Sequence, residues 1–178
     1  MRIFVAIDLL NDIGDYLYDL QKKIGSGYAK IKFTDKKSLH LTLKFLGEIS
    51  EDKVENIKNE LKNIKFNKFE TKLGKLGVYP NETKINVVWI SIEPEFNVVE
   101  LQKLVDSETL NFGDIKLGAH ITLGRVKFIK NKDKFKERLF NIKVENLKFK
   151  VDSFKLYRSV LSKDGPKYNV LEEYKLNP

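Results

Sequence analysis

The apolar positions of this chain follow two periods, and each period predicts one kind of element. Apolar residues three and four apart place one face of a helix against a core. This spacing, with residues that typically start helices, predicts helices that begin at or after Asn11, Ser50, Pro94 and Asn131. Continuous or alternating apolar stretches predict strands over residues 2–9, 40–47, 66–78, 85–92, 120–129, 149–161 and 168–176.

The segments between these elements also contain residues that typically end helices or form turns. The run Gly25-Ser26-Gly27 is expected to end the first helix, and residues 162–167 are expected to form the turn of a C-terminal hairpin. The order strand, helix, strand, helix occurs twice, which predicts an internal repeat over approximately residues 1–80 and 81–178 of a single domain. Strands that alternate with helices favour an α/β or α+β fold, here with two lobes about a pseudo-twofold axis.

Composition narrows the classes of function. The chain has 178 residues and 42% hydrophobic residues, enough for a sizeable core in one domain. It has no cysteine, which excludes disulfides, cysteine nucleophiles and thiolate metal sites. Its two histidines are too few for a catalytic zinc site with three ligands unless carboxylates contribute.

The formal net charge of +8 favours anionic partners such as nucleic acid. The lysines are spread along the whole chain, so charge alone is equally compatible with a solvated surface. No apolar stretch approaches the roughly 20 residues that span a bilayer, and Asp8 interrupts the apolar start of the chain. A cytoplasmic protein without a membrane partner is therefore expected.

Both histidines stand in the same local pattern, His-x-Thr-Leu, at the start of matching predicted strands. Side chains alternate between the faces of a strand, so His40 shares one face with Thr42, and His120 shares one face with Thr122. The intervening leucines and isoleucine then form the core side. If the pseudo-twofold holds, two imidazoles and two hydroxyls face one groove.

Two imidazoles suit acid–base chemistry near neutral pH, since one can accept a proton while the other donates one. In-line displacement at phosphorus needs a base on one side and an acid on the other, and hydroxyls can donate to the phosphate oxygens. A single His-x-Thr on a strand is more often structural. Two such pairs, which use every histidine at matching points of a repeat, favour the catalytic interpretation.

With these motifs the chain resembles the two-histidine (2H) phosphoesterases. It most resembles their LigT-like and ThpR-like branch, the RNA 2',3'-cyclic phosphodiesterases, which are also called 2'-5' RNA ligases. The resemblance covers essentially the full length. It rests on Arg2-x-Phe4-x-Ala6-Ile7, His40-Leu41-Thr42-Leu43-Lys44-Phe45-Leu46-Gly47, Val88-Trp89, His120-Ile121-Thr122-Leu123-Gly124-Arg125-Val126, Leu156-Tyr157-Arg158-Ser159 and Gly165-Pro166-x-Tyr168. The family often has proline before the second histidine, where this chain has Ala119.

The resemblance implies a bilobal α+β fold, with antiparallel sheets, outer helices and a central cleft. It implies hydrolysis of a 2',3'-cyclic phosphate on RNA or a nucleotide to a 2'-phosphate, with ATP-independent 2'-5' joining of tRNA halves as an associated activity. By the family pattern His40 is the proton donor, His120 is the proton acceptor, and Thr42 and Thr122 hold the phosphate. No metal or cofactor is implied, and a monomer acting on RNA ends is expected.

For residues near the two motifs and on the late strand, the sequence allows more than one role. Arg125 is a candidate for substrate binding. Strict alternation places it on the face opposite His120, where a structural ion pair is the alternative, and a bulge at Gly124 would turn it towards the substrate. Lys44 is four residues after His40, so alternation places both on the same face of the strand. It is therefore a candidate for contact with RNA phosphate, and a solvated lysine is the alternative. Tyr157 and Arg158 lie on a late strand and are candidates for substrate binding, since the resemblance implies that one of them lines the cleft; an ordinary exposed strand is the alternative. Two aromatic residues are expected in the core, which are Phe45 and Trp89.

Two other classes of function stay open. One is a non-catalytic module that binds RNA or nucleotides on the same fold, and a pH–rate profile with two limbs would argue against it. The other is a general binding domain with a ferredoxin-like sheet, in which both histidines are buried and structural. Histidines of that kind would not respond to phosphate ligands.

Overall fold

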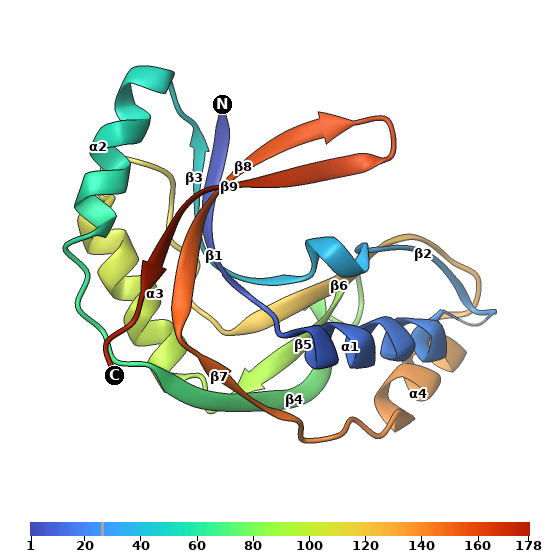
Figure 1. Cartoon of the computed structure of the whole chain (residues 1–178). Helices are drawn as coiled ribbons and strands as arrows, with labels where there is room; N and C mark the ends of the chain where they lie inside the picture. The colour runs from blue at the N-terminus through green and yellow to red at the C-terminus, as the bar shows by residue number, and fades with distance from the viewer. Residues whose placement is uncertain (26) are drawn as a thin grey trace.

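A curved antiparallel sheet forms the centre of the molecule (Figure 1). The computed structural model describes residues 1–25 and 27–178. The strands are β1 (Arg2–Asp8), β2 (Ala29–Phe33), β3 (His40–Glu48), β4 (Phe69–Pro80), β5 (Ile85–Glu93), β6 (His120–Ile129), β7 (Lys148–Val151), β8 (Ser153–Ser162) and β9 (Gly165–Lys175). The helices are α1 (Asn11–Ile24), the 3-10 turn η1 (Lys36–Ser38), α2 (Glu51–Leu61), α3 (Phe96–Glu108) and α4 (Lys132–Asn141).

The strand order divides the sheet into two halves that meet at its middle. The order is β7-β4-β5-β6-β3-β1-β8-β9, with β2 added beside β6. The halves join where β3 pairs with β6 through Leu41 and Ile121. One half contains β1, β3, β8 and β9, and the other contains β4, β5, β6 and β7. The halves of the sheet therefore do not coincide with the two repeats of the sequence, because β8 and β9 belong to the second repeat but lie beside β1 of the first. The predicted α+β architecture with two related halves is confirmed.

The helices interlock the two halves. The predicted apolar stripe of α1 is buried, and α1 packs against β6 in the opposite half of the sheet. Helix α3 packs against β3 in the same crossed manner, and α2 packs against α3. Figure 1 shows α2 and α3 together on one side and α1 and α4 near the other end of the sheet. Each strand that carries a His-x-Thr motif is therefore supported by a helix from the other repeat.

Two matching bulges interrupt the central strands. Along β1 and β3, Val5 pairs with Lys44 and Ala6 pairs with Thr42, so Leu43 is an extra residue in β3. Along β5 and β6 the same break leaves Leu123 as an extra residue, directly after Thr122. An extra residue shifts the alternation of side chains by one position beyond it. These shifts decide which later residues of each strand face the groove.

Most predicted elements are present, with adjusted ends. Asn131 caps α4 through its side chain, as predicted, whereas Asn11 is the first residue of α1 instead of its cap. Strand β2 was not predicted. The hairpin turn is shorter than predicted, because β8 runs to Ser162 and β9 begins at Gly165. Of the predicted helix stop, Ser26 lies outside the described residues, and α1 ends before Gly25.

Within the described part of the chain, no helix has the length and apolar character needed to cross a membrane.

Candidate active site

The pairing of β3 with β6 brings the two His-x-Thr motifs together. Leu41 and Ile121 pair across the two strands and are fully buried on the core side. Their neighbours along each strand point to the opposite face, which is the concave face of the curved sheet. Because the strands are antiparallel, this register sets His40 opposite Thr122 and Thr42 opposite His120. The register thus puts two imidazoles and two hydroxyls on one face of the sheet, as the sequence predicts.

The flanking strands give each histidine an aromatic neighbour. Phe4 on β1 lies with its ring centroid 5.0 Å from that of His40. Trp89 on β5 lies 5.7 Å from the ring of His120. The two aromatic–histidine contacts are equivalent because β1 pairs with β3 in the same way that β5 pairs with β6. The pseudo-twofold relation therefore extends from the motifs to their surroundings. Phe4 is buried, while Trp89 is partly exposed and lies beside the site instead of in the core.

His40 is held by the backbone just before it. Its Nδ1 atom lies 2.7 Å from the carbonyl oxygen of Ser38, at the end of η1. A carbonyl oxygen only accepts, so Nδ1 carries a hydrogen and Nε2 is left for chemistry. Burial lowers the pKa of His40 below its ordinary value, while the hydrogen bond to Ser38 and the charge of Asp8 oppose that shift.

His120 has a different environment. Its residue is exposed at the groove, and desolvation by the surrounding protein lowers its pKa below the ordinary value. The residue before it is fixed, because the carbonyl oxygen of Ala119 accepts from the backbone N–H of Ile92 at 2.9 Å. The two imidazoles are therefore chemically unequal despite the matching strands.

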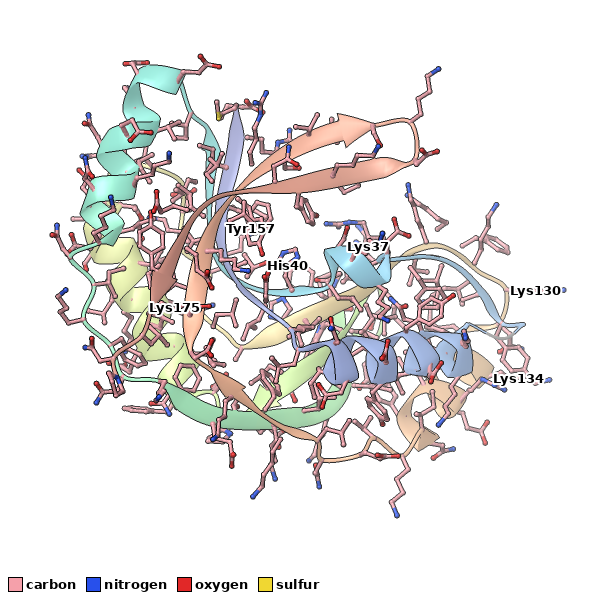
Figure 2. The ribbon with its side chains drawn as sticks, viewed as in Figure 1. Lys37, His40, Lys130, Lys134, Tyr157 and Lys175 are labelled. Atoms are coloured by element: carbon pink, nitrogen blue, oxygen red, sulfur yellow. The ribbon has the colours of Figure 1, made fainter. Side chains whose placement is uncertain are left out.

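A cavity of about 370 Å³ opens beside His40. Its walls come from β1, α1, η1, β3, β8 and β9, and they include His40, Lys37, Tyr157 and Tyr168. Figure 2 shows His40 and Tyr157 on the inner side of the sheet, with Lys37 on the nearby turn. Tyr168 meets the ring of His40 edge-on, with the centroids 5.4 Å apart. The predicted position of Tyr157 at the cleft is therefore correct, and Tyr168 joins it.

Asp8 connects this cavity to β8. The register of β1 and β3 sets Asp8 opposite His40. Its carboxylate accepts a hydrogen bond from the Tyr157 hydroxyl and pairs with the Lys155 ammonium at 2.5 Å. Burial, followed by the contact with Asp8, raises the pKa of Tyr157, and the ion pair with Asp8 raises the pKa of Lys155. Tyr157 therefore stays protonated and acts as a donor and an aromatic wall.

The bulge at Leu123 turns Arg125 into the groove. Val88 pairs with Gly124 on the core side, and Val87 pairs with Arg125 on the same side as Trp89. The side chain of Arg125 lies near enough to Tyr168 that its charge lowers the tyrosine's pKa, partly offsetting the effect of burial. Of the two alternatives in the sequence, the bulge is the one realised. It begins at Leu123, one residue earlier than expected.

Two candidate residues point elsewhere. Lys44 was expected to share the face of His40, but the bulge at Leu43 turns it beneath the sheet. There its ammonium pairs with Asp106 at 2.6 Å and donates to the carbonyl oxygen of Thr109 at 2.9 Å. Arg158 pairs with Ile3 and so lies on the face opposite Tyr157. The prediction that Lys44 contacts phosphate is therefore wrong, and so is its alternative of a solvated lysine, because Lys44 is buried. Of Tyr157 and Arg158, the structure places Tyr157 at the cavity.

Phe45 is a further residue, besides Trp89 and Tyr168, that sequence reasoning did not place on the His-x-Thr face of the sheet. It was expected in the core, yet it is 57% exposed and pairs with Phe4 on the groove side. The same bulge that buries Lys44 exposes Phe45. The repeat carried a usable signal, because Phe45 occupies the place in its motif that Arg125 occupies in the other.

Two buried glutamines hold the bulged strands from behind. Gln102 on α3 donates to the carbonyl oxygens of Thr42 and Gly118 and accepts from the backbone N–H of Gly118. Gln21 on α1 donates to the carbonyl oxygens of Thr34 and Leu123. Bulges leave backbone groups without ladder partners, and buried groups of this kind need another partner. Each glutamine thus fixes a motif strand from a helix of the other repeat.

The described residues contain no group of three or more histidine, cysteine, aspartate or glutamate side chains arranged to hold a metal ion. What the groove presents is a pair of histidines in unequal settings, two threonine hydroxyls and an arginine. This set can move one proton to and one proton from a substrate while it holds an anionic group.

A comparison with protein families agrees with this chemistry. The family described as "LigT like Phosphoesterase" matches residues 7–89 and 93–168, which include both His-x-Thr motifs. The chain belongs to the LigT-like phosphoesterases. The family resemblance stated from the sequence is confirmed, and with it the assignment of the chain as a phosphoesterase.

Relatives among the LigT-like proteins are similar over their full length. A protein of Methanocaldococcus jannaschii named RNA 2',3'-cyclic phosphodiesterase is 36% identical, with 98% of this chain and 100% of the relative covered. A protein of the same name from Methanothermobacter thermautotrophicus is 33% identical, with 99% of each chain covered. The match therefore spans the whole LigT-like unit.

Solved structures share the LigT-like fold. A crystal structure of a Thermus thermophilus protein aligns with a TM-score of 0.78 and 26% identity, covering 98% of this chain and 97% of the other. The structure of Escherichia coli LigT complexed with 3'-AMP aligns with a TM-score of 0.78 and 24% identity, covering 99% and 98%. The bilobal architecture predicted from the sequence is thus that of known structures.

Proposed function

We propose that this protein hydrolyses the 2',3'-cyclic phosphate at an RNA or nucleotide end and leaves a 2'-phosphate, without a metal ion. The observation that carries the proposal is the pairing of β3 with β6, whose register puts His40, Thr42, His120 and Thr122 on one face of the sheet. The relatives named RNA 2',3'-cyclic phosphodiesterase support the choice of substrate.

In the proposed reaction His120 is the base and His40 is the acid. His120 takes a proton from water, and the water oxygen attacks phosphorus. The bond from phosphorus to the 3'-oxygen breaks, and His40 gives its proton to that oxygen. The family resemblance is the basis of this assignment. Burial lowers the pKa of both histidines, and the hydrogen bond to Ser38 and the charge of Asp8 oppose that effect at His40. Nε2 of His40 is the atom that donates, since Nδ1 is bonded to Ser38.

The phosphate is held by hydroxyls and by a cation. Thr42 and Thr122 lie beside the opposite histidines in the register and are placed to donate to the non-bridging oxygens. Arg125 on the same face adds a positive charge that matches the anionic transition state. The formal net charge of +8 supports an RNA substrate over an uncharged one.

Ligation uses the same step with a different nucleophile. If the 5'-hydroxyl of a second RNA attacks phosphorus in place of water, the 3'-oxygen leaves as before and a 2'-5' linkage forms. No ATP is needed, because the cyclic phosphate is the activated group. We propose this as a minor activity that depends on the fragments bound, with tRNA halves as candidate substrates. A single chain is the proposed catalytic unit, since it supplies both histidines.

The test is product analysis on a short RNA that ends in a 2',3'-cyclic phosphate, with EDTA present. The proposal predicts that a 2'-phosphate accumulates and a 3'-phosphate does not. Release of a 3'-phosphate would mean that the 2'-oxygen departs and would overturn the regiochemistry. RNA that is bound but unchanged would favour a binding module without catalysis.

A further inference from the structure

Strand β6 continues past the start of β3, and there β2 takes the place of β3 beside it. The register sets Thr122 opposite His40, the first residue of β3. Residues 124–129 of β6 then pair with β2. At about 3.3 Å per residue, this stretch adds on the order of 15–20 Å to the surface that starts at the histidines. We call these paired segments, residues 29–33 and 124–129, the β2–β6 extension.

The β2–β6 extension carries three positive charges and one aromatic ring on the His-x-Thr face of the sheet. Arg125 lies on that face and pairs with Lys32. Further along, Phe128 pairs with Lys30, which shares the face of Lys32 because the two lysines are two residues apart. The residue between them, Ile31, packs against the core on the opposite face. The charges and the ring therefore continue the face on which the motifs lie.

The protection of an edge strand does not account for this set. Lysines discourage an edge strand from pairing with other chains, which suffices for Lys30 and Lys32 by themselves. It does not account for Phe128, which is 63% exposed. In the described part of the chain, no carboxylate forms an ion pair with Lys30, Lys32 or Arg125. An exposed ring among such cations is typical of a surface that binds single-stranded nucleic acid.

The proposed reaction indicates which part of an RNA lies on the β2–β6 extension. In that reaction His40 protonates the departing 3'-oxygen, while water attacks from the side of His120. In-line displacement sets the attacking and the departing oxygen on opposite sides of phosphorus. The ribose that keeps the 3'-oxygen therefore lies on the side of His40. The chain that continues from its 5'-carbon then leaves in the direction of Arg125.

We propose that the β2–β6 extension binds the nucleotides that precede the cyclic end, so that the preferred substrate is an RNA strand over a free cyclic nucleotide. Lys30 and Lys32 contact phosphates of the strand, and Phe128 stacks on one of its bases. This inference rests on the proposed function, because it takes the cyclic phosphate to lie between the two histidines. Neither kind of contact reads the identity of a base, so the extension selects for length and not for sequence.

The first test is the double variant Lys30→Gln/Lys32→Gln, which removes both charges of β2 and keeps polar side chains. Each phosphate contact to a single strand contributes about 0.7 to the slope of log affinity against log salt, so that slope is expected to fall by about 1.4. KM for an RNA of several nucleotides is expected to rise by at least about ten-fold at low salt. KM for a 2',3'-cyclic mononucleotide is expected to stay the same, because that substrate does not reach β2.

The matched control is Lys53→Gln/Lys62→Gln. Both lysines are exposed at α2, which lies on the other side of the molecule from β2 (Figure 1). This control lowers the net charge by the same amount. It is expected to keep both KM values and the salt slope of the unaltered protein.

A second variant, Phe128→Leu, tests the ring without a change of charge. Loss of one base stack is expected to raise KM for the RNA by about ten-fold and to leave the salt slope unchanged. KM for the cyclic mononucleotide is again expected to stay the same. Phe96→Leu is the matched control, because Phe96 is 67% exposed at the start of α3.

The outcomes separate this inference from the proposed function. If the unaltered protein hydrolyses both substrates and Lys30→Gln/Lys32→Gln keeps its KM for RNA and its salt slope, the inference is overturned while the function stands. An equal rise of KM on both substrates also overturns it, because the effect would then lie at the histidines. If the unaltered protein hydrolyses neither substrate, the proposed function fails.

Binding then decides on the extension alone. Fluorescence anisotropy with a labelled RNA that ends in a 2'-phosphate gives the dissociation constant and its salt slope without any hydrolysis. A lower slope in Lys30→Gln/Lys32→Gln than in Lys53→Gln/Lys62→Gln supports RNA binding by the extension. The same slope in both overturns it.

Discussion

The Nδ1 atom of His40 lies 2.7 Å from the carbonyl oxygen of Ser38, so the ring is oriented by the turn that precedes its strand. This contact fixes the tautomer of the neutral ring and leaves Nε2 toward the groove. It also favours the protonated ring, which opposes the effect of burial on the pKa. One backbone contact thus fixes which ring nitrogen of His40 is free for other partners.

The pH dependence of kcat/KM follows from the two histidine pKa values. Both are lowered from the ordinary value of 6.5, chiefly by desolvation. The active form has one histidine protonated and the other neutral, so its population is greatest between the two pKa values. The base must lose its proton on the acidic limb, and the acid loses its proton on the basic limb. We expect a bell-shaped profile with its maximum below pH 6.5. A maximum at clearly alkaline pH would contradict this assignment.

Arg125 and Arg158 make a matched pair for testing charge in the groove. Arg125 lies on the groove face, whereas Arg158 lies on the opposite face of its strand. Replacing Arg125 by Gln removes a cation that faces the phosphate, so kcat/KM should fall by at least about ten-fold. Replacing Arg158 by Gln changes the net charge equally and should leave kcat/KM nearly unchanged. Equal losses in the two variants would mean that long-range charge, and not contact, is responsible.

Gln102 couples the two motifs through the backbone. Its amide bonds Thr42 and Gly118, and the latter is two residues before His120. In Gln102→Met the side chain keeps its length and loses these bonds, so the histidines lose their alignment. We expect kcat to fall by about 10–100-fold with little change in KM. The NMR signal of the His120 ring should shift as well.

A matched control for Gln102 is Tyr174→Phe. Tyr174 is also buried, and its hydroxyl donates to the backbone carbonyl of Lys58 on α2 at 3.2 Å. This variant should lose stability and keep kcat. If it loses as much kcat as Gln102→Met, the effect of Gln102 is general destabilisation.

The buried pair Lys44 and Asp106 predicts an unequal effect on stability. The Lys44 side chain is fully buried, whereas the Asp106 side chain is 27% exposed. Asp106→Ala leaves a buried ammonium without its carboxylate and should lower the free energy of unfolding by about 3 kcal/mol. Lys44→Met fills the same space with an apolar chain and should cost less, because water reaches Asp106. Urea denaturation measures both, and the reverse order would contradict the burial argument.

The alternation of side chains was sufficient to predict the centre of the site. His40 and His120 are each followed by one core residue and one threonine, and the strands are regular over that stretch. The repeat then supplied the second relation, because equivalent strands of a pseudo-twofold fold meet at its axis. Phosphoesterase chemistry could be inferred from those few positions.

Beyond the motifs the same rule failed, because alternation carries no information about bulges. Lys44 and Phe45 exchanged their expected positions when Leu43 became the extra residue. Whether a strand bulges depends on its partners, and Gln102 and β1 are far from β3 in sequence. Strand β2 was missed for a similar reason. Its alternating lysines suit an edge strand, and only the pairing with β6 defines it.

The most direct test of the central claim is a comparison of single-turnover hydrolysis by the unaltered protein, His40→Ala and His120→Ala, on RNA ending in a 2',3'-cyclic phosphate with EDTA present. The account predicts that either substitution reduces the rate by at least about 10²–10⁴-fold while the variants stay folded and still bind the RNA. If either variant hydrolysed the RNA at nearly the unaltered rate, the paired acid–base mechanism would be wrong.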